Sequence, residues 1–304
     1  MAKNAVNRLE KSLRGVNKWA SGRSLPTTSF KEYLEGRGNI GLAVSGLSGL
    51  FVLGMEEVSQ SLLAAGRGQW SLANQHMAHG FARMLYAQAI DLNNVKGSNR
   101  EIIGNLDDVT HLMLGAIAMG RLELVKPFYE KVFEGIHGGY GIRDGHDVSL
   151  DSTLRYAAFG LSIIGDWLGH PLDLQKHALP RDLAWGQLVA NWRNPDPDVL
   201  LPALLLACDT HVERIALTER EDDSGKFEFG SVFLAVHPTE ILAVLRLRDL
   251  LGLPNPKEID HPLMKTPYAA ITCLPGAVTE RDELLEQFLA VVRQRDPQVL
   301  PAGL

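Results

Sequence analysis

Residues 105–135 read NLDDVTHLMLGAIAMGRLELVKPFYEKVFEG, and this stretch decides the fold class. Apolar residues recur in it at the three- and four-residue spacing of a helix, first over 106–120 and again over 125–136. The Gly-Arg break between the two stripes is too short for anything except antiparallel neighbours, so we expect a helical hairpin. A lone hairpin cannot bury both of its apolar faces. The remaining helices must therefore pack around it.

The same periodicity recurs along most of the chain and predicts about ten helices. No run has a convincing strand pattern, and only FEFGSVFLAV (227–236) is ambiguous. These patterns predict an all-α fold, an irregular multi-helix bundle built from antiparallel helical hairpins. We expect one all-helical domain over residues 1–304, within which 1–66 is the candidate for a loosely packed subdomain.

Three local signals give sharper expectations. Residues 40–65 read as a helix but carry four glycines between positions 41 and 54, and each glycine costs up to about 1 kcal/mol against alanine. We expect these glycines to allow close helix contact or to break the segment into two pieces. Ser71 is the expected N-cap of the next helix. Pro127 is expected at the first position of the hairpin's second arm, which would begin near Lys126.

The bulk composition is that of a soluble globular protein, with 45% hydrophobic and 22% charged residues. A net charge of −6 argues against a general nucleic-acid binder, since nothing in the balance neutralises phosphates. Cys208 and Cys273 form no CxxC pair and are expected to be buried, reduced thiols. The N-terminus lacks the apolar core of a secretory signal, and the uncharged run 40–55 is too short to span a bilayer. We expect a cytoplasmic protein with no membrane contact.

One cluster could bind a metal ion. His76 and His79 lie three residues apart on a predicted helix, and Asp107 and His111 open the next one. Histidines and carboxylates on adjoining helices form the metal sites of di-iron bundles, but those bundles use Glu-x-x-His, which this chain lacks. The position of Asp107 is already explained by the helix start, where carboxylates are favourable. We therefore expect no metal and no cofactor.

Other catalytic signals are weak. The pair His146-Asp147 is reminiscent of helical phosphohydrolases, but it follows a glycine-rich loop rather than lying within a helix. No G-x-S-x-G motif or histidine-activated cysteine points to nucleophilic catalysis. The acidic run at 218–226 is most simply a solvated loop. Its functional interpretation is a contact surface for a basic partner, where charge sets association rate and specificity. The candidate contact residues are Glu219, Glu221, Asp222 and Asp223.

A resemblance to a known group of proteins comes from the C-terminal third. HPTEILAVLRLRDLLGLP (237–254), followed by DHPLMKTP (260–267), is similar to the tail of helical immunity proteins of bacterial contact-dependent and type VI secretion systems. The PoNi immunity family is more distantly similar. The resemblance implies a cytoplasmic, stoichiometric inhibitor of a toxin, such as a nuclease-type effector. These families have no catalytic motif, so no site residue carries over.

Our interpretation from sequence is a non-enzymatic immunity protein whose partner is a cognate toxin. Two alternatives remain open. One is a helical metal-dependent enzyme that uses His76, His79, Asp107 and His111. The other is a helical-repeat adaptor without a toxin partner. The sequence leaves the oligomeric state open.

Overall fold

The chain is all-α throughout the part that the structure describes. This computed structural model describes residues 3–22, 26–94, 106–138, 154–171, 173–175 and 179–303, with the backbone alone at 3–6 and 131–138. Over these ranges it contains fourteen α-helices, three short 3-10 helices and a single isolated bridge between Ile215 and Phe229. The predicted all-α, multi-helix fold is confirmed. The finer prediction of a succession of antiparallel hairpins stays a prediction.

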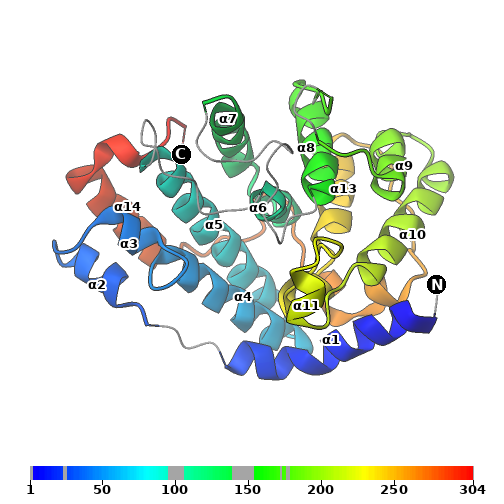
Figure 1. Cartoon of the computed structure of the whole chain (residues 1–304), viewed down its shortest axis with the longest axis horizontal. Helices are drawn as coiled ribbons and strands as arrows, with labels where there is room; N and C mark the ends of the chain where they lie inside the picture. The colour runs from blue at the N-terminus through cyan, green and yellow to red at the C-terminus, as the bar shows by residue number, and fades with distance from the viewer. Residues whose placement is uncertain are drawn as a thin grey trace.

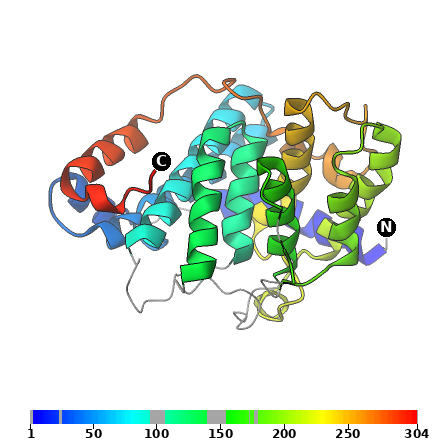
Figure 2. The same cartoon turned by 90° about the horizontal axis from the view of Figure 1, so that it is seen from above.

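Helix α6 (Leu106–Ala118) lies at the centre of the molecule. Every residue of α6 is buried except Asp107 and Asp108 in its first turn. Neighbouring helices surround it, several of them side by side in Figure 2. Its partners are α5 (Trp70–Asn94), α7 (Leu122–Gly138), α8 (Arg155–Leu168) and α13 (Thr239–Leu250). The stretch that decided the fold class is therefore the innermost helix of the bundle.

The other elements enclose this centre. Helix α1 runs along the lower edge of the molecule in Figure 1, α14 with α2 and α3 forms one end, and α9 with α10 forms the other. One hydrophobic core extends from Leu9 in α1 to Val299 near the C-terminus. The remaining α-helices are α1 (Lys3–Ser21), α2 (Thr28–Leu34), α3 (Ile40–Val44), α4 (Leu50–Gly66), α9 (Leu183–Asn191), α10 (Pro197–Glu213), α11 (Glu219–Asp222), α12 (Val232–Val236) and α14 (Glu283–Arg295). The 3-10 helices are η1 (Pro262–Lys265), η2 (Pro267–Ala270) and η3 (Pro297–Val299).

The glycine-rich segment contains both features expected of it. The chain leaves α3 at Val44 and re-enters a helix at Leu50, so the segment is broken in two. Further along, Gly54 of α4 lies against Gly80 of α5. A Cβ on Gly54 would lie 2.8 Å from the carbonyl oxygen of Gly80, and one on Gly80 would lie 2.9 Å from that of Gly54. The two backbones therefore touch at a point that admits no side chain.

Two expectations about helix starts were wrong. α7 begins at Leu122, which places Pro127 inside the helix rather than at its first position. Because Pro127 has no N–H, α7 lacks one hydrogen bond, to the carbonyl of Glu123 in its first turn. The loss of stability is therefore confined to the region near the start of the helix. α5 begins at Trp70, and Ser71 lies within its first turn instead of capping it.

The end of α6 is closed by a distant segment. Thr272 donates its hydroxyl to the carbonyl of Ala118 at 2.7 Å, and the N–H of Cys273 donates to the same oxygen at 3.2 Å. Gly120 follows with φ +67°, and a Cβ there would lie 2.7 Å from the backbone of Leu274. The long connection between η2 and α14 (Figure 2) is therefore fixed across the C-terminus of the central helix.

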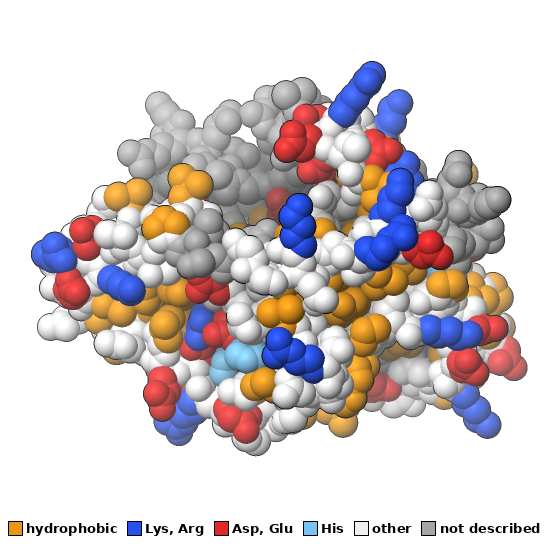
Figure 3. All heavy atoms as spheres, turned by 90° about the horizontal axis from the view of Figure 1, so that it is seen from below, with side chains coloured by type: hydrophobic (Ala, Val, Ile, Leu, Met, Phe, Trp, Pro, Cys, Tyr) orange, Lys and Arg blue, Asp and Glu red, His pale blue; other side chains and the backbone are white. Residues whose placement is uncertain are grey.

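The surface mixes apolar and charged side chains. Figure 3 shows the face seen from below, where apolar side chains form bands and acidic and basic groups lie around them. No helix in the described part of the chain is both long and apolar enough to cross a membrane.

The contact between α4 and α5 gives a stability prediction. Replacing Gly80 by alanine should destabilise the protein by about 1–3 kcal/mol, because the added methyl group overpacks two touching backbones. Gly186 is the matched control, since a Cβ on this exposed residue of α9 meets nothing within 4 Å. Gly186→Ala should stabilise by up to about 1 kcal/mol through helix propensity. Urea unfolding of both variants measures the difference, and equal effects would contradict the packing argument.

Candidate functional site: the acidic helix and the charged network behind it

The acidic run forms α11, a short helix whose carboxylates have different roles. Glu219 and Asp223 are exposed. Glu221 is half-buried and accepts two hydrogen bonds from the guanidinium of Arg8 in α1, at 2.8 and 3.0 Å. Asp222 is half-buried as well. Of the four predicted contact residues, two therefore face solvent and one holds the helix in place.

Arg8 anchors α11 through several contacts. Besides Glu221, it donates to the carbonyl of Ile215 at 2.7 Å and its guanidinium lies 4.8 Å from the centre of the Phe227 ring. The hydrogen bond from Arg8 is the main cause that lowers the pKa of Glu221 to about 2. The Glu221 carboxylate also accepts the N–H of Leu217 at 2.7 Å. Glu221 thus remains ionised at all ordinary pH values and ties the acidic helix to α1.

A sequence signal for the start of α11 existed and was missed. Thr218 caps α11 and accepts the N–H of Glu221, three residues later, at 3.2 Å. A Thr-x-x-Glu spacing is typical of a capping arrangement at a helix N-terminus. The run is therefore a short capped helix, not the irregular loop that its composition suggested.

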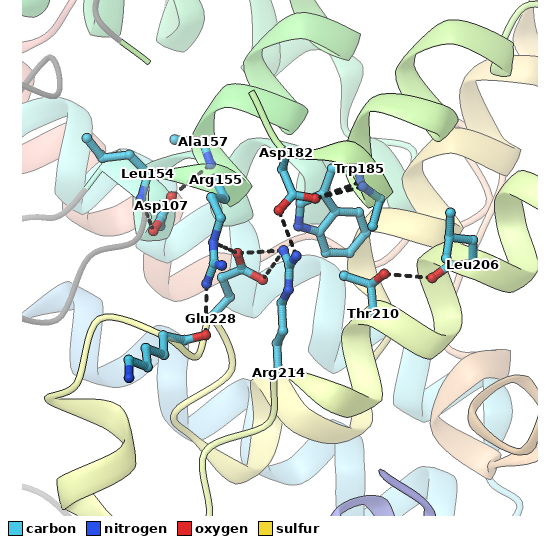
Figure 4. Close-up of polar contacts among 12 residues, drawn as sticks. Asp107, Leu154, Arg155, Ala157, Asp182, Trp185, Leu206, Thr210, Arg214 and Glu228 are labelled. Atoms are coloured by element: carbon cyan, nitrogen blue, oxygen red, sulfur yellow. Dashed lines mark hydrogen bonds and ion pairs between the residues drawn. The ribbon is translucent and has the colours of Figure 1, made fainter. Parts of the chain in front are cut away.

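Behind α11, a network of charged side chains joins three helices to the segment before α12 (Figure 4). Glu228 has no exposed side-chain surface and pairs at 3.0 Å with both Arg155 of α8 and Arg214, which follows α10. Arg214 also pairs with Asp182 at 2.7 Å, and Asp182 caps α9 by accepting the N–H groups of Ala184 and Trp185. One buried carboxylate therefore fixes the relative positions of α8, α9 and α10.

Burial and charge act in opposite directions within this network. Burial raises the pKa of Glu228, and the nearby Arg214 and Arg155 only partly offset that rise. At Asp182, burial alone would raise the pKa, but the N–H of Trp185 and the guanidinium of Arg214 outweigh it and lower the pKa. Both arginines are needed, because a buried carboxylate left without a partner is strongly destabilising.

A small pocket lies beside the network. It is lined by Asp107, Asp108, His111, Tyr156, Glu228, Phe229 and Leu234. Asp107 accepts the N–H groups of Leu154 and Ala157, at 3.0 and 2.8 Å, and so closes the start of α8. Leu154 has φ 55°, a left-handed conformation that leucine rarely adopts, and these bonds help to hold it there.

Burial holds two polar groups of the pocket in their neutral forms. Burial lowers the pKa of His111 to about 3, so its imidazole is neutral near pH 7. Burial also raises the pKa of Tyr156 well above its ordinary value, so its hydroxyl remains protonated. The cysteines are equally inert, because burial raises the pKa of both Cys208 and Cys273. His111 and Tyr156 are therefore both neutral near pH 7.

Two further histidines bond to side chains in the first turn of α13. His211 lies 2.6 Å from the carboxylate of Glu240 through one ring nitrogen and 3.1 Å from the carbonyl of Ala235 through the other, and neither side chain is exposed. The ring nitrogens of His237 lie 2.7 Å from the Thr239 hydroxyl and 3.1 Å from the carbonyl of Ile271. These side chains hold backbone turns together in the core.

The structure does not assemble the metal site of the alternative hypothesis. His76 bonds to Glu57 at 2.6 Å and His79 faces the carbonyl of Glu280 at 3.1 Å. Asp107 caps α8, and His111 bonds to Thr239 at 2.9 Å. Among the residues that the structure describes, no group of three or more histidines, cysteines or carboxylates could hold a metal ion. The pair His146-Asp147 lies outside the described residues.

Instead, the His76 region belongs to an ionic tether for the C-terminal helix. Arg83 of α5 pairs with Glu57 of α4 at 2.9 Å and makes two bonds to Asp282, at 2.7 and 2.8 Å. Asp282 caps α14 by accepting the N–H of Leu285 at 3.1 Å. Asp282 therefore joins the start of α14 to α4 and α5.

Comparison with known proteins gives no relative for this chain. No protein family, curated protein or solved structure matches it. Its function is therefore argued from the geometry alone.

The buried network predicts unequal costs for two arginine substitutions. Arg214→Ala removes a partner of both Glu228 and Asp182 and should destabilise the protein by about 3–5 kcal/mol. Arg193 provides the control, because its ion pair with Asp166 is more than 40% exposed on both sides. Arg193→Ala should cost at most about 1 kcal/mol. Denaturant titration of the two variants tests the ranking, and comparable losses would show that Glu228 does not depend on Arg214.

The tether of α14 predicts a pH dependence. Burial alone would raise the pKa of both Glu57 and Asp282. Bonds from His76 and Arg83 to Glu57 outweigh burial and lower its pKa below the ordinary 4.5. Bonds from Arg83 do the same for Asp282, whose ordinary pKa is 3.8. Lowered carboxylate pKa values mean that the unfolded chain binds more protons, so this stability is present above about pH 4.5 and is lost as the pH falls. Asp282→Asn keeps a capping side chain but removes the charge. Its free-energy deficit against the wild type should therefore shrink between pH 7 and pH 3 in chemical denaturation. A deficit that stays constant with pH would exclude the ionic contribution.

Proposed function

We propose that this chain is an immunity protein that binds and neutralises a cognate antibacterial toxin in the cytoplasm by stoichiometric protein–protein inhibition. The observation that carries the proposal is the construction of α11. Glu219 at the start of α11 and Asp223 directly after its end are exposed, and Glu221 between them is bound by Arg8. Exposed charges on a helix that is already held in place suit recognition of a charged partner, because little conformational entropy is lost on binding.

The distribution of charge supports a basic partner. Residues 196–228 contain nine carboxylates against three lysines and arginines, a net charge of −6. That value equals the net charge of the whole chain, so the remainder is balanced. A local excess of one sign steers an oppositely charged protein toward that part of the surface and raises its association rate.

A nuclease-type toxin fits this surface for a physical reason. A nuclease must hold phosphates, so its substrate-binding surface carries lysine and arginine. An inhibitor that places carboxylates there competes with nucleic acid for the same charges. Exposed Glu219 of α11 and Asp223, which directly follows that helix, offer such carboxylates.

The ionisable groups with catalytic potential are engaged elsewhere, which supports binding over catalysis as the function. Glu228 holds Arg155 and Arg214, and Asp107 caps α8. The residues of the metal hypothesis bond to separate partners. In the described part of the chain these side chains are used to position helices.

Co-expression tests the proposal. The open reading frame next to this gene is expressed alone and together with this chain, and growth and complex formation are followed. Toxicity that is suppressed by this chain, with a one-to-one complex on size-exclusion chromatography, is expected. A harmless neighbour, or a toxic one that this chain neither binds nor suppresses, would overturn the immunity function.

Charge reversal on α11 gives a prediction for the same pair. Glu219→Arg/Asp223→Arg should weaken binding at least about tenfold, mainly through slower association that depends on ionic strength. The control is Glu35→Arg/Glu130→Arg, which changes two exposed carboxylates, one directly after α2 and one on α7, and alters the net charge equally. Stopped-flow association at low and high salt separates local from overall charge. Equal slowing by both variants would mean that α11 is not the contact.

A further inference from the structure

The solvent face of α10 is apolar where a surface helix is ordinarily polar. Val199, Pro202 and Leu206 follow one another at spacings of three and four residues, so they lie on one side of the helix. All three are exposed, Val199 by 46% and Leu206 by 39%. Single exposed apolar residues are ordinary, but an aligned set on one helix face marks a candidate contact surface.

Carboxylates border this stripe at both ends. Asp198 precedes Val199, and Glu213 lies seven residues after Leu206 on the same side of the helix. Both are exposed, and no lysine or arginine lies within α10 itself. An apolar centre with a charged rim is the arrangement that protein interfaces favour. We call these five residues, 198, 199, 202, 206 and 213, the α10 docking face.

The helix under this face is held firmly. Asp196 caps its start by accepting the N–H of Asp198 at 2.9 Å. At its other end, Arg214 is bound by Glu228 and Asp182, which also fixes α9 alongside (Figure 4). A surface fixed in this way loses little conformational entropy on binding.

Charge decides between two occupants of the face. In a two-fold dimer the same surface appears on both sides, so the acidic rim of one copy would meet the acidic rim of the other. Like charges brought together across an interface are costly, which argues against a second copy of this chain. A partner with an apolar anchor flanked by lysine or arginine satisfies both the stripe and the rim.

We infer that the α10 docking face binds the basic toxin of the proposed function, with an apolar anchor of the toxin seated on Val199, Pro202 and Leu206. The inference rests on that function and adds the surface that supplies affinity. Steering by α11 acts on the association rate, whereas burial on α10 acts on the dissociation rate. The two contributions are therefore separable by kinetics.

The test uses the full chain and the purified product of the neighbouring open reading frame. Val199→Lys/Leu206→Lys should weaken binding at least about tenfold, mostly through faster dissociation, and should reduce suppression of toxicity. Leu42→Lys/Leu47→Lys is the matched control, because these leucines are 53% and 82% exposed at the other end of the molecule. This control should bind like the wild type. Thermal unfolding confirms that both variants are folded.

The outcomes separate the two proposals. If the wild-type chain binds and suppresses the toxin while both lysine variants do so equally well, the α10 docking face is wrong and the immunity function stands. If the wild-type chain itself neither binds nor suppresses it, the function fails and the docking face fails with it. Self-association of the wild-type chain that is abolished by Val199→Lys/Leu206→Lys would instead assign the face to a second copy.

Discussion

The structure depends on the complete burial of α6. A helix surrounded on all sides has no polar face to give to solvent, and α6 leaves only Asp107 and Asp108 outside. Its neighbours can approach because small residues occupy the contact points. A Cβ on Gly115 would lie 1.9 Å from the Phe81 ring, and one on Gly160 of α8 would lie 2.3 Å from Thr110. The surrounding helices are placed by these close approaches.

A closely packed centre leaves its polar groups little freedom, and this bears on function. Charged side chains near α6 are bound to one another or to helix ends, as in the group around Glu228 and in the pair His211–Glu240. Such contacts specify how the helices meet. The surface features used in the proposed function lie instead on the outer helices, where α10 and α11 carry an apolar stripe and an excess of negative charge.

Sequence reasoning succeeded for the fold class, because the apolar period of α6 follows from residues within a few positions of one another. It was less reliable at helix ends, where Ser71 and Pro127 lie at other positions than expected. It failed where partners are remote. Arg8 and Glu221 are 213 residues apart, and no spacing rule connects them. The same holds for Arg155 and Glu228. The alternative metal cluster is not assembled for a related reason, since side chains on adjoining helices need not point toward a common centre.

The position of α6 also has a consequence for how the chain reaches this structure. Its neighbour α13 begins at Thr239, more than a hundred residues after α6 ends at Ala118. During synthesis, the central helix therefore emerges long before one of its covering partners exists, and the side that α13 covers stays without that partner in the meantime. Contacts between such distant segments form slowly because the long intervening loop must first be closed. During this interval, the nascent chain exposes apolar surface of the kind that chaperones bind.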